Sequence, residues 1–290
     1  MNRGVVVALL ILLIAVVSDV HASKSRSRQS LNGRTIDLSW NTVPDTIPTI
    51  PQPIDTPTLK FAAEAYEEED FNGQISGPMA GPWENILSTD KFEGTAVTKV
   101  FRSQKLQTLI VAYKGTSNLN NVVEDLKAMI SVECVYNDIE CGRVGLGFKN
   151  TFELDVDDVH DAIYPYIQKN YRIVFTGHSL GGATSTLALF YFATAYPKYK
   201  KFELVTYASP RVGNADFVES FSTNVNSYIS KRRFVTRWRV GKLNSVDAVT
   251  MVPPQFYHMS RALPIRCPHT DPLRCHFMTS YESGYRKISV

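Results

Sequence analysis

Ser179 is the residue of this chain whose type and setting best suit nucleophilic chemistry. It lies in "VFTGHSLGGAT", residues 174–184, where an apolar stretch typical of a buried strand meets small residues typical of a helix start. A serine at a strand-turn-helix junction is the setting of a nucleophile elbow. Gly177 and Gly181 fit this setting, because side chains there would strike the neighbouring helix or strand. A serine that merely caps a helix is the alternative, but it would not need small residues on both sides.

A serine hydroxyl becomes a good nucleophile only when a base takes its proton, so a histidine and an orienting carboxylate should follow. In elbow folds the chain order is serine, acid, histidine. Asp216 and Glu219 lie in a predicted amphipathic helix, where exposure is the usual reason for an acid. Asp247 instead follows a predicted strand and precedes "AVTMVPP", whose prolines fix a loop. We therefore expect Asp247 to be the orienting acid.

Three histidines follow Ser179, namely His258, His269 and His276. His258 lies too close to Asp247 along the chain to reach the site from a separate loop. His269 and His276 both lie near the second pair of cysteines, and the residues alone leave either as the base.

The N-terminus has the pattern of a secretory signal over residues 1–22. Arg3 precedes an unbroken apolar run from Val5 to Val17, and Val20-His21-Ala22 provides a small-residue cleavage pattern. The run is short for a membrane span. The sequence thus predicts a secreted protein with no stable membrane span.

Secretion favours disulfides for the four cysteines. Cys134 and Cys141 lie seven residues apart and Cys267 and Cys275 eight apart, so two local bridges are the simplest of three possible pairings. The spacing does not fit a zinc site. The chain has no Asn-x-Ser/Thr acceptor, so N-glycosylation is not expected.

Residues 23–58 form a basic, proline-rich leader or arm. The chain has a formal net charge of +3, and residues 23–35 alone carry +4, so the rest is slightly acidic. A basic face for nucleic acid is therefore not expected. "TIPTIPQPIDTPT" favours extended backbone, so a single compact domain should span residues 59–290.

Helical and extended patterns alternate through this domain. Apolar spacing predicts helices over 59–71, 156–171 (interrupted at Pro165), 180–197 and 214–225, and strands over 96–103, 108–115, 171–177, 202–209 and 233–240. The first two strands should form a hairpin. The order implies an α/β fold with a largely parallel, twisted sheet and helices on both faces.

Three motifs, "IVFTGHSLGGA", "YASPRVGN" (207–214) and "DAVTMVPP" (247–254), together resemble the class 3 lipases, the secreted fungal-type triacylglycerol lipase and feruloyl esterase group. The resemblance covers roughly residues 59–290 and implies an α/β-hydrolase fold. By position, it makes Ser179 the nucleophile and Asp247 the acid. "HFMTSY" resembles the catalytic segment of the family in an H-x-M-x-x-Y form, which favours His276 as the base.

Further roles follow from the same resemblance. "VAYKGTSNLNN" makes Thr116 the first oxyanion donor and the Leu180 N–H the second, and Asp125 matches an aspartate that supports the oxyanion residue when a lid opens. Segment 117–132 has an apolar helical face and matches the lid position, although an ordinary surface helix has the same periodicity.

The resemblance implies a secreted serine hydrolase of lipid carboxylic esters, with acylglycerols as the favoured substrates and no metal or organic cofactor. A phospholipase or carboxylesterase on the same scaffold is the first alternative. A catalytically idle secreted lipid-binding protein is the second. The expected partner is a lipid ester at a lipid-water interface, and the oligomeric state is left open.

Overall fold

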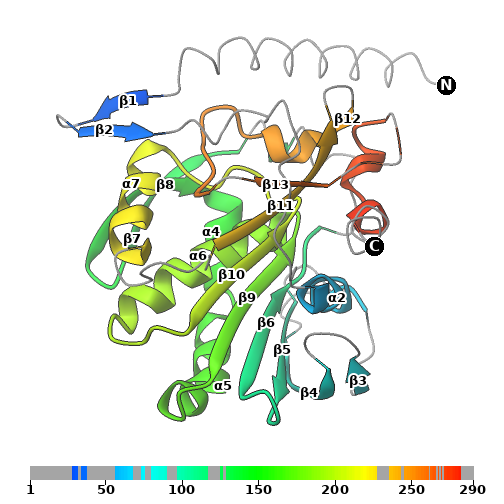
Figure 1. The fold of residues 1–290 in the computed structure, drawn as a ribbon. Helices are drawn as coiled ribbons and strands as arrows, with labels where there is room; N and C mark the ends of the chain where they lie inside the picture. The colour runs from blue at the N-terminus through cyan, green and yellow to red at the C-terminus, as the bar shows by residue number, and fades with distance from the viewer. Residues whose placement is uncertain are drawn as a thin grey trace.

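A computed structural model describes a large part of the chain (Figure 1). The residues described are 28–31, 34–37, 56–67, 73–75, 80–89, 97–116, 125–126, 129–226, 235–242, 245–260, 262–265, 267, 269 and 271–281.

A nine-stranded mixed sheet forms the centre of the described part. Its strand order is β12-β11-β10-β9-β6-β5-β4-β3, with β13 paired to β11. The pairs β6–β9, β9–β10, β10–β11 and β11–β13 are parallel, while β3 to β6 form an antiparallel meander and β12 is antiparallel to β11. The strands are β3 (Gly73–Ile75), β4 (Gly81–Ser88), β5 (Thr98–Ser103), β6 (Thr108–Tyr113), β9 (Arg172–His178), β10 (Phe202–Tyr207), β11 (Val235–Lys242), β12 (Ser245–Val246) and β13 (Ala262–Ile265).

Helices cover both faces of this sheet (Figure 1). Strand side chains alternate between faces, so the central strands β6, β9 and β10 contribute to two separate cores. One face carries α4 (Leu146–Glu153), α5 (Val156–Gln168), α6 (Leu180–Ala195) and α7 (Ala215–Phe221). The other carries α2 (Thr56–Glu64) and C-terminal residues. The predicted largely parallel sheet with helices on both faces is confirmed. Short helical turns complete the described part: η2 (Ser222–Asn226), η3 (Ala248–Met251) and η4 (Arg274–His276).

Helix α5 corrects one expectation, because it is continuous through Pro165. Its apolar residues Val159, Ile163 and Ile167 are buried, whereas Pro165 is exposed. The backbone carbonyl that a proline leaves without a partner is therefore on the solvent side, where water can hydrate it. The apolar periodicity proved the better guide to the extent of the helix.

Helix α2 also departs from its predicted range of 59–71, since it begins at Thr56 and ends at Glu64. The amide of Tyr66 donates to the carbonyl of Ala63 at 2.9 Å, so the chain tightens into a turn there. Tyr66 thereby leaves the helix and lies against the sheet residue His178.

Two antiparallel ribbons accompany the main sheet. The first consists of β1 (Arg28–Leu31) and β2 (Arg34–Asp37), within the basic leader. The second consists of β7 (Ser131–Tyr136) and β8 (Ile139–Gly145), joined by Asn137 and Asp138. Both of these turn residues have positive φ, 52° and 62°, which a two-residue hairpin of this hand requires.

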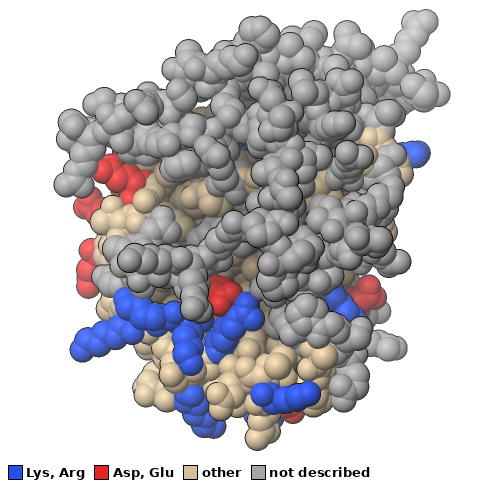
Figure 2. Space-filling model, viewed as in Figure 1, with Lys and Arg blue, Asp and Glu red and all other residues tan. Residues whose placement is uncertain are grey.

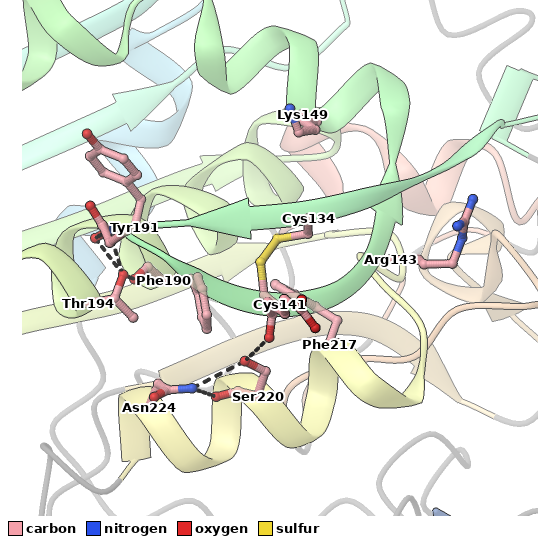
Figure 3. The surroundings of a disulfide bond; sticks show 12 residues. Cys134, Cys141, Arg143, Lys149, Phe190, Tyr191, Thr194, Phe217, Ser220 and Asn224 are labelled. Carbon is pink, nitrogen blue, oxygen red and sulfur yellow. Dashed lines mark hydrogen bonds between the residues drawn. A yellow bond between two sulfur atoms is a disulfide. The ribbon is translucent and has the colours of Figure 1, made fainter.

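A disulfide joins Cys134 of β7 to Cys141 of β8. Figure 3 shows this bridge with Phe190 of α6 and Phe217 of α7 beside it. Both cysteines are buried in the larger core, and Ser220 Oγ donates to the carbonyl of Glu140 at 3.4 Å. The second hairpin is therefore attached to the α6–α7 layer. The Cys134–Cys141 bridge itself is the local pairing that the cysteine spacing predicted.

Basic side chains gather on the lower part of the face seen in Figure 2. That end of the molecule contains the connections from α5 to β9 and from α6 to β10 (Figure 1). The two connections touch, because Lys201 Nζ donates to the carbonyl of Asn170 at 2.7 Å. They precede the parallel strands, so this basic end and the carboxyl ends of the strands lie at opposite edges of the sheet.

Candidate functional site

Ser179 lies between the last residue of β9 and the first residue of α6. Its backbone has φ 57° and ψ −129°, a conformation that non-glycine residues rarely adopt and that costs about 1–3 kcal/mol. A Cβ at Gly177 would lie 2.3 Å from the Gly181 backbone, and one at Gly181 would lie 2.0 Å from the Tyr113 carbonyl oxygen. The turn can thus close only with glycine at both positions, as the sequence predicted.

Ser179, His276 and Asp247 form one hydrogen-bonded chain. His276 Nε2 lies 2.8 Å from Ser179 Oγ, and His276 Nδ1 lies 3.0 Å from both Asp247 Oδ1 and Asp247 Oδ2. A neutral imidazole that donates from Nδ1 to the carboxylate accepts from the serine hydroxyl at Nε2. This geometry suits the roles of nucleophile, general base and orienting acid that the sequence predicts for these residues.

Two further contacts fix the carboxylate of Asp247. The Val249 amide donates to Oδ1 at 3.0 Å, because Asp247 caps the 3₁₀ turn η3. The Tyr281 hydroxyl donates to Oδ2 at 2.6 Å. Asp247 is 0% exposed, so these donors replace the water that a buried carboxylate loses. Tyr281 is the last residue of "HFMTSY", but no pattern in the sequence indicated Asp247 as its partner.

The three histidines that follow Ser179 in the chain differ in their burial and in their contacts. His276 ends η4, directly after the Cys267–Cys275 disulfide, and is 1% exposed. His269 is exposed, and its side chain makes no contact with the site among the residues described. His258 is buried, with Nε2 2.8 Å from the carbonyl oxygen of Thr250. Of these three histidines, only His276 has a ring nitrogen within hydrogen-bond distance of Ser179.

The predicted oxyanion residues lie beside the serine in the chain or in space. Leu180 is its neighbour and the first residue of α6. Thr116 follows Gly115, where a Cβ would lie 3.1 Å from Ser179 Cβ. The close approach of residue 115 places the start of this loop beside Ser179.

The predicted lid is described only in part. Residues 117–124 and 127–128 lie outside the described residues. Asp125 is exposed, Leu126 is buried, and Ile130 is 64% exposed. The Asp125 side chain therefore points to solvent in this structure. The expectation of one helical segment over 117–132 is wrong at its end, because residues 129 and 130 are not helical and β7 begins at Ser131.

His178 and Tyr66 are two residues of the site that sequence reasoning missed. His178 Nε2 lies 2.8 Å from the carbonyl oxygen of His276, and the Tyr66 hydroxyl lies 3.0 Å from His178 Nδ1. Burial, and then the charge of nearby His276, lower the pKa of His178 to about 3. The position of His178 next to Ser179 was a signal that could have drawn attention to it.

Among the residues described, no group of three histidine, cysteine, aspartate or glutamate side chains could hold a metal ion. Within the same part of the chain, no helix combines the length and apolar character needed to cross a bilayer.

The sequence of this chain is similar to one protein family and to several lipases. The family model "Lipase (class 3)" matches residues 110–257, just over half of the chain. A lipase from Rhizopus oryzae is 28% identical over 165 residues, which cover 54% of this chain and 38% of that protein. Secreted mono- and diacylglycerol lipase A from Penicillium camembertii is 27% identical over 192 residues, 59% of each chain.

Two more similar proteins extend the comparison. Secreted mono- and diacylglycerol lipase 1 from Fusarium solani is 34% identical over 179 residues, 57% of this chain and 51% of that protein. A crystal structure of a mutant form of MDLA from Penicillium cyclopium has a TM-score of 0.56 and 23% identity, over 73% of this chain and 79% of that one. The chain spans between 38% and 59% of the length of the curated relatives named here.

The parallel sheet, the helices on both faces and the strained serine after β9 define an α/β-hydrolase fold. Within that fold class, the chain belongs to the class 3 lipase family.

Proposed function

We propose that this protein is a secreted serine hydrolase that cleaves carboxylic esters of lipids, with acylglycerols as its favoured substrates. The observation that carries the proposal is the continuous contact from Ser179 Oγ to His276 Nε2 and from His276 Nδ1 to Asp247, in a site protected from water. Its relatives named as lipases and as mono- and diacylglycerol lipases support the substrate class.

The proposed reaction begins when His276 Nε2 takes the proton of the Ser179 hydroxyl. The Ser179 oxygen attacks the ester carbonyl carbon and forms a tetrahedral intermediate. His276 then returns the proton to the leaving alcohol, and an acyl-enzyme remains. Water repeats the sequence and releases the fatty acid. Asp247 holds the imidazole in the required tautomer and stabilises the imidazolium that forms at each step.

The oxyanion of the intermediate needs donors next to Ser179. We assign the N–H groups of Thr116 and Leu180 to this role. The support is the position of Leu180 at the start of α6 and the approach of the 115–116 backbone to Ser179. Donors of this kind typically contribute about 3–4 kcal/mol to transition-state stabilisation.

Access to the site requires a movement. Ser179 is 1% exposed and His276 1% exposed, so an ester carbonyl cannot reach the hydroxyl in this conformation. We propose that the part of segment 117–132 that precedes β7, residues 117–130, acts as the lid, because it begins directly after Thr116 and Asp125 is available to hold that residue when the lid opens. Phe277, next to His276, is already 45% exposed and offers an apolar contact for a lipid.

A phospholipase or soluble carboxylesterase would use the same chemistry, and a catalytically idle lipid-binding protein would share the fold. The secretory pattern of residues 1–22 supports an extracellular location. The proposed acylglycerol lipase and these alternatives differ in which ester, if any, the protein hydrolyses.

Labelling with a fluorophosphonate tests the nucleophile, and release assays on emulsified triacylglycerol, diacylglycerol, phosphatidylcholine and a soluble butyrate ester test the substrate. We expect labelling that Ser179→Ala abolishes, with fastest release from acylglycerols. Absence of labelling would support the idle binding protein, and faster release from phosphatidylcholine would replace the acylglycerol assignment.

A further inference from the structure

His178 makes a contact with the candidate base that the proposed chemistry does not use. We infer that His178 is a positioning residue, which clamps the backbone of His276 over Ser179 through its Nε2–H, while the Tyr66 hydroxyl holds it in the tautomer that this clamp requires. The inference rests on the proposed function, because it assigns His276 the role of base.

The direction of each hydrogen bond fixes the tautomer. The partner of His178 Nε2 is the carbonyl oxygen of His276 at 2.8 Å, and a carbonyl can only accept. Nε2 must therefore carry a hydrogen. In the neutral ring Nδ1 is then an acceptor, and the Tyr66 hydroxyl at 3.0 Å donates to it. The opposite tautomer would set the lone pair of Nε2 against the carbonyl oxygen.

The clamp is needed because His276 is outside the sheet. It lies on the single turn η4, whose amide at residue 276 donates to the carbonyl of Leu273 at 3.0 Å. The contacts of its ring with Ser179 and Asp247 orient the imidazole but leave the backbone to be held by other groups. His178 adjoins Ser179 in the chain, so its bond ties base and nucleophile to one rigid elbow.

A neutral His178 is also compatible with the charge that His276 acquires. The two rings lie 4.8 Å apart between centroids, and His178 is 3% exposed. If both imidazoles were protonated, two positive charges would face each other with little solvent between them. A neutral His178 that donates from Nε2 places no second positive charge next to the imidazolium of His276.

Tyr66 extends this chain to the N-terminal part of the domain. It follows α2, and its hydroxyl fits only because residue 115 has no side chain: a Cβ there would lie 2.2 Å from the hydroxyl oxygen. Tyr66, His178 and His276 thus connect α2 to the base across the elbow.

The test compares His178→Phe, which keeps a ring of similar shape and removes both nitrogens, with His178→Gln, which keeps an N–H donor. Tyr66→Phe removes only the hydroxyl. Thr58→Val is the matched control, since it removes another buried hydroxyl bond between α2 and the sheet, 2.7 Å to Tyr207, outside this chain of contacts. Turnover of a soluble butyrate ester is expressed per site titrated by fluorophosphonate, so unfolded protein does not count.

We expect His178→Phe to lower kcat about ten- to hundredfold, as misplacement of a catalytic group does, with KM within about twofold. His178→Gln should recover part of this loss, Tyr66→Phe should lower kcat several-fold, and Thr58→Val should match the wild type. Unchanged kcat in both His178→Phe and Tyr66→Phe would overturn the inference.

A second readout needs no substrate. Ring ¹⁵N shifts of His178 in the Ser179→Ala protein should show a hydrogen on Nε2 and a bare Nδ1, and Tyr66→Phe should alter the Nδ1 shift. A hydrogen on Nδ1 would overturn the clamp even if the wild type is active. If the wild type hydrolyses no ester, the proposed function fails while the ring shifts still decide the hydrogen bond.

Discussion

Single residues near Ser179 are held by more contacts than the reaction uses directly. Asp247 accepts hydrogen bonds from His276, Tyr281 and the Val249 amide, and His276 is held at its ring, its amide and its carbonyl. Each of these groups is almost fully buried. A reacting group that is fixed before substrate arrives loses little entropy in the transition state.

The first prediction separates the two histidines beside the second disulfide. Ser179→Ala and His276→Ala should each lower kcat by about 10⁴-fold or more, because nucleophile and base act as a unit, and Asp247→Ala should be somewhat milder. His269→Ala should keep wild-type turnover, since its side chain is exposed. Steady-state rates on a soluble ester, with circular dichroism to check folding, measure this. Normal turnover in His276→Ala together with loss in His269→Ala would reverse the assignment.

A second prediction concerns the stability of the folded protein at acid pH. His178 has a pKa of about 3 in the folded protein, lowered first by burial and then by His276, against about 6.5 in an unfolded chain. Between these values the unfolded state binds more protons, so the free energy of unfolding falls as pH drops from about 6.5 toward 3. The slope attributable to this group approaches about 1.4 kcal/mol per pH unit.

Urea unfolding at several pH values in that window measures the effect. His178→Gln has no titrating ring and should show the smaller slope, whereas His269→Gln, at an exposed position, should follow the wild type. Equal slopes for wild type and His178→Gln would show that the neutral ring is not a source of acid sensitivity. Among the residues described, Tyr66, His276, Tyr281 and Asp247 are the titratable groups that interact with His178, and they stay in place in both proteins.

Much of the site could be predicted from residue types along the chain, and some of it could not. Ser179 was recognisable because glycines on both sides have a steric reason, and Asp247 because a carboxylate followed a strand. The roles of Tyr66, His178 and Tyr281 depend on contacts over 112, 98 and 34 residues of sequence, which no local pattern encodes.

Whole elements position the site through the order of the sheet. β9 brings Ser179 to the carboxyl edge, β12 ends one residue before Asp247, and η4 carries His276. β9 and β10 each have a hydrogen-bonded neighbour strand on both sides. η4 is a single turn, so its position depends on side-chain contacts and on one disulfide.

The third prediction therefore concerns the Cys267–Cys275 bridge, which ends one residue before His276. Cys267→Ser/Cys275→Ser should lower activity markedly at temperatures where far-ultraviolet circular dichroism is unchanged, because it frees the segment that carries the base. Cys134→Ser/Cys141→Ser is the control, since that bridge closes the β7–β8 hairpin instead. If both pairs lose activity in parallel with secondary structure, the second bridge has no special bearing on His276.

A fourth prediction addresses the lid. The apolar face of residues 117–130 should cover the acyl site in water and turn to lipid when an aggregated ester is present. The rate should rise, modestly, as a dispersed ester passes its solubility limit, because the segment has aliphatic side chains but no tryptophan or phenylalanine to anchor in an interface. Val122→Ser/Val123→Ser should reduce that rise. A smooth wild-type curve, or an unchanged rise in the double variant, would indicate a permanently open esterase.

Helices and strands were predictable from the sequence where the apolar pattern extended over many residues. The strand ending at the elbow and the helix after it were predicted closely, because β9 is buried over almost its whole length and α6 on nearly every side. The limits of α2 were wrong, since the end of that helix is set by the contact of Tyr66 with His178. The interruption expected at Pro165 was also wrong, because the lost backbone bond faces solvent.

At the scale of the whole molecule, the sheet separates two cores of different size. The larger contains α4 to α7, whereas the smaller contains α2 and C-terminal residues that include Ile265, Cys275 and Tyr281. Ser179 precedes a helix of the larger core, and His276 belongs to the segment that closes the smaller one. The proposed nucleophile and the proposed base therefore depend on different hydrophobic cores.

The burial of α6 on nearly every side predicts which segments of this protein should open first by local unfolding. Residues 181–190 of α6 are buried without exception, and the hydroxyls of Thr184, Ser185 and Thr186 donate to carbonyls one turn earlier. Such amides exchange with deuterium only when the whole domain opens, whereas the single turn η4 can open alone. Exchange followed by mass spectrometry should show η4 and Tyr281 labelled far earlier than β9 and α6, and equal protection would contradict this order. If this order holds, mild stress would leave the nucleophile in a native scaffold from which its base has already detached, and activity would be regained as fast as one short segment re-forms.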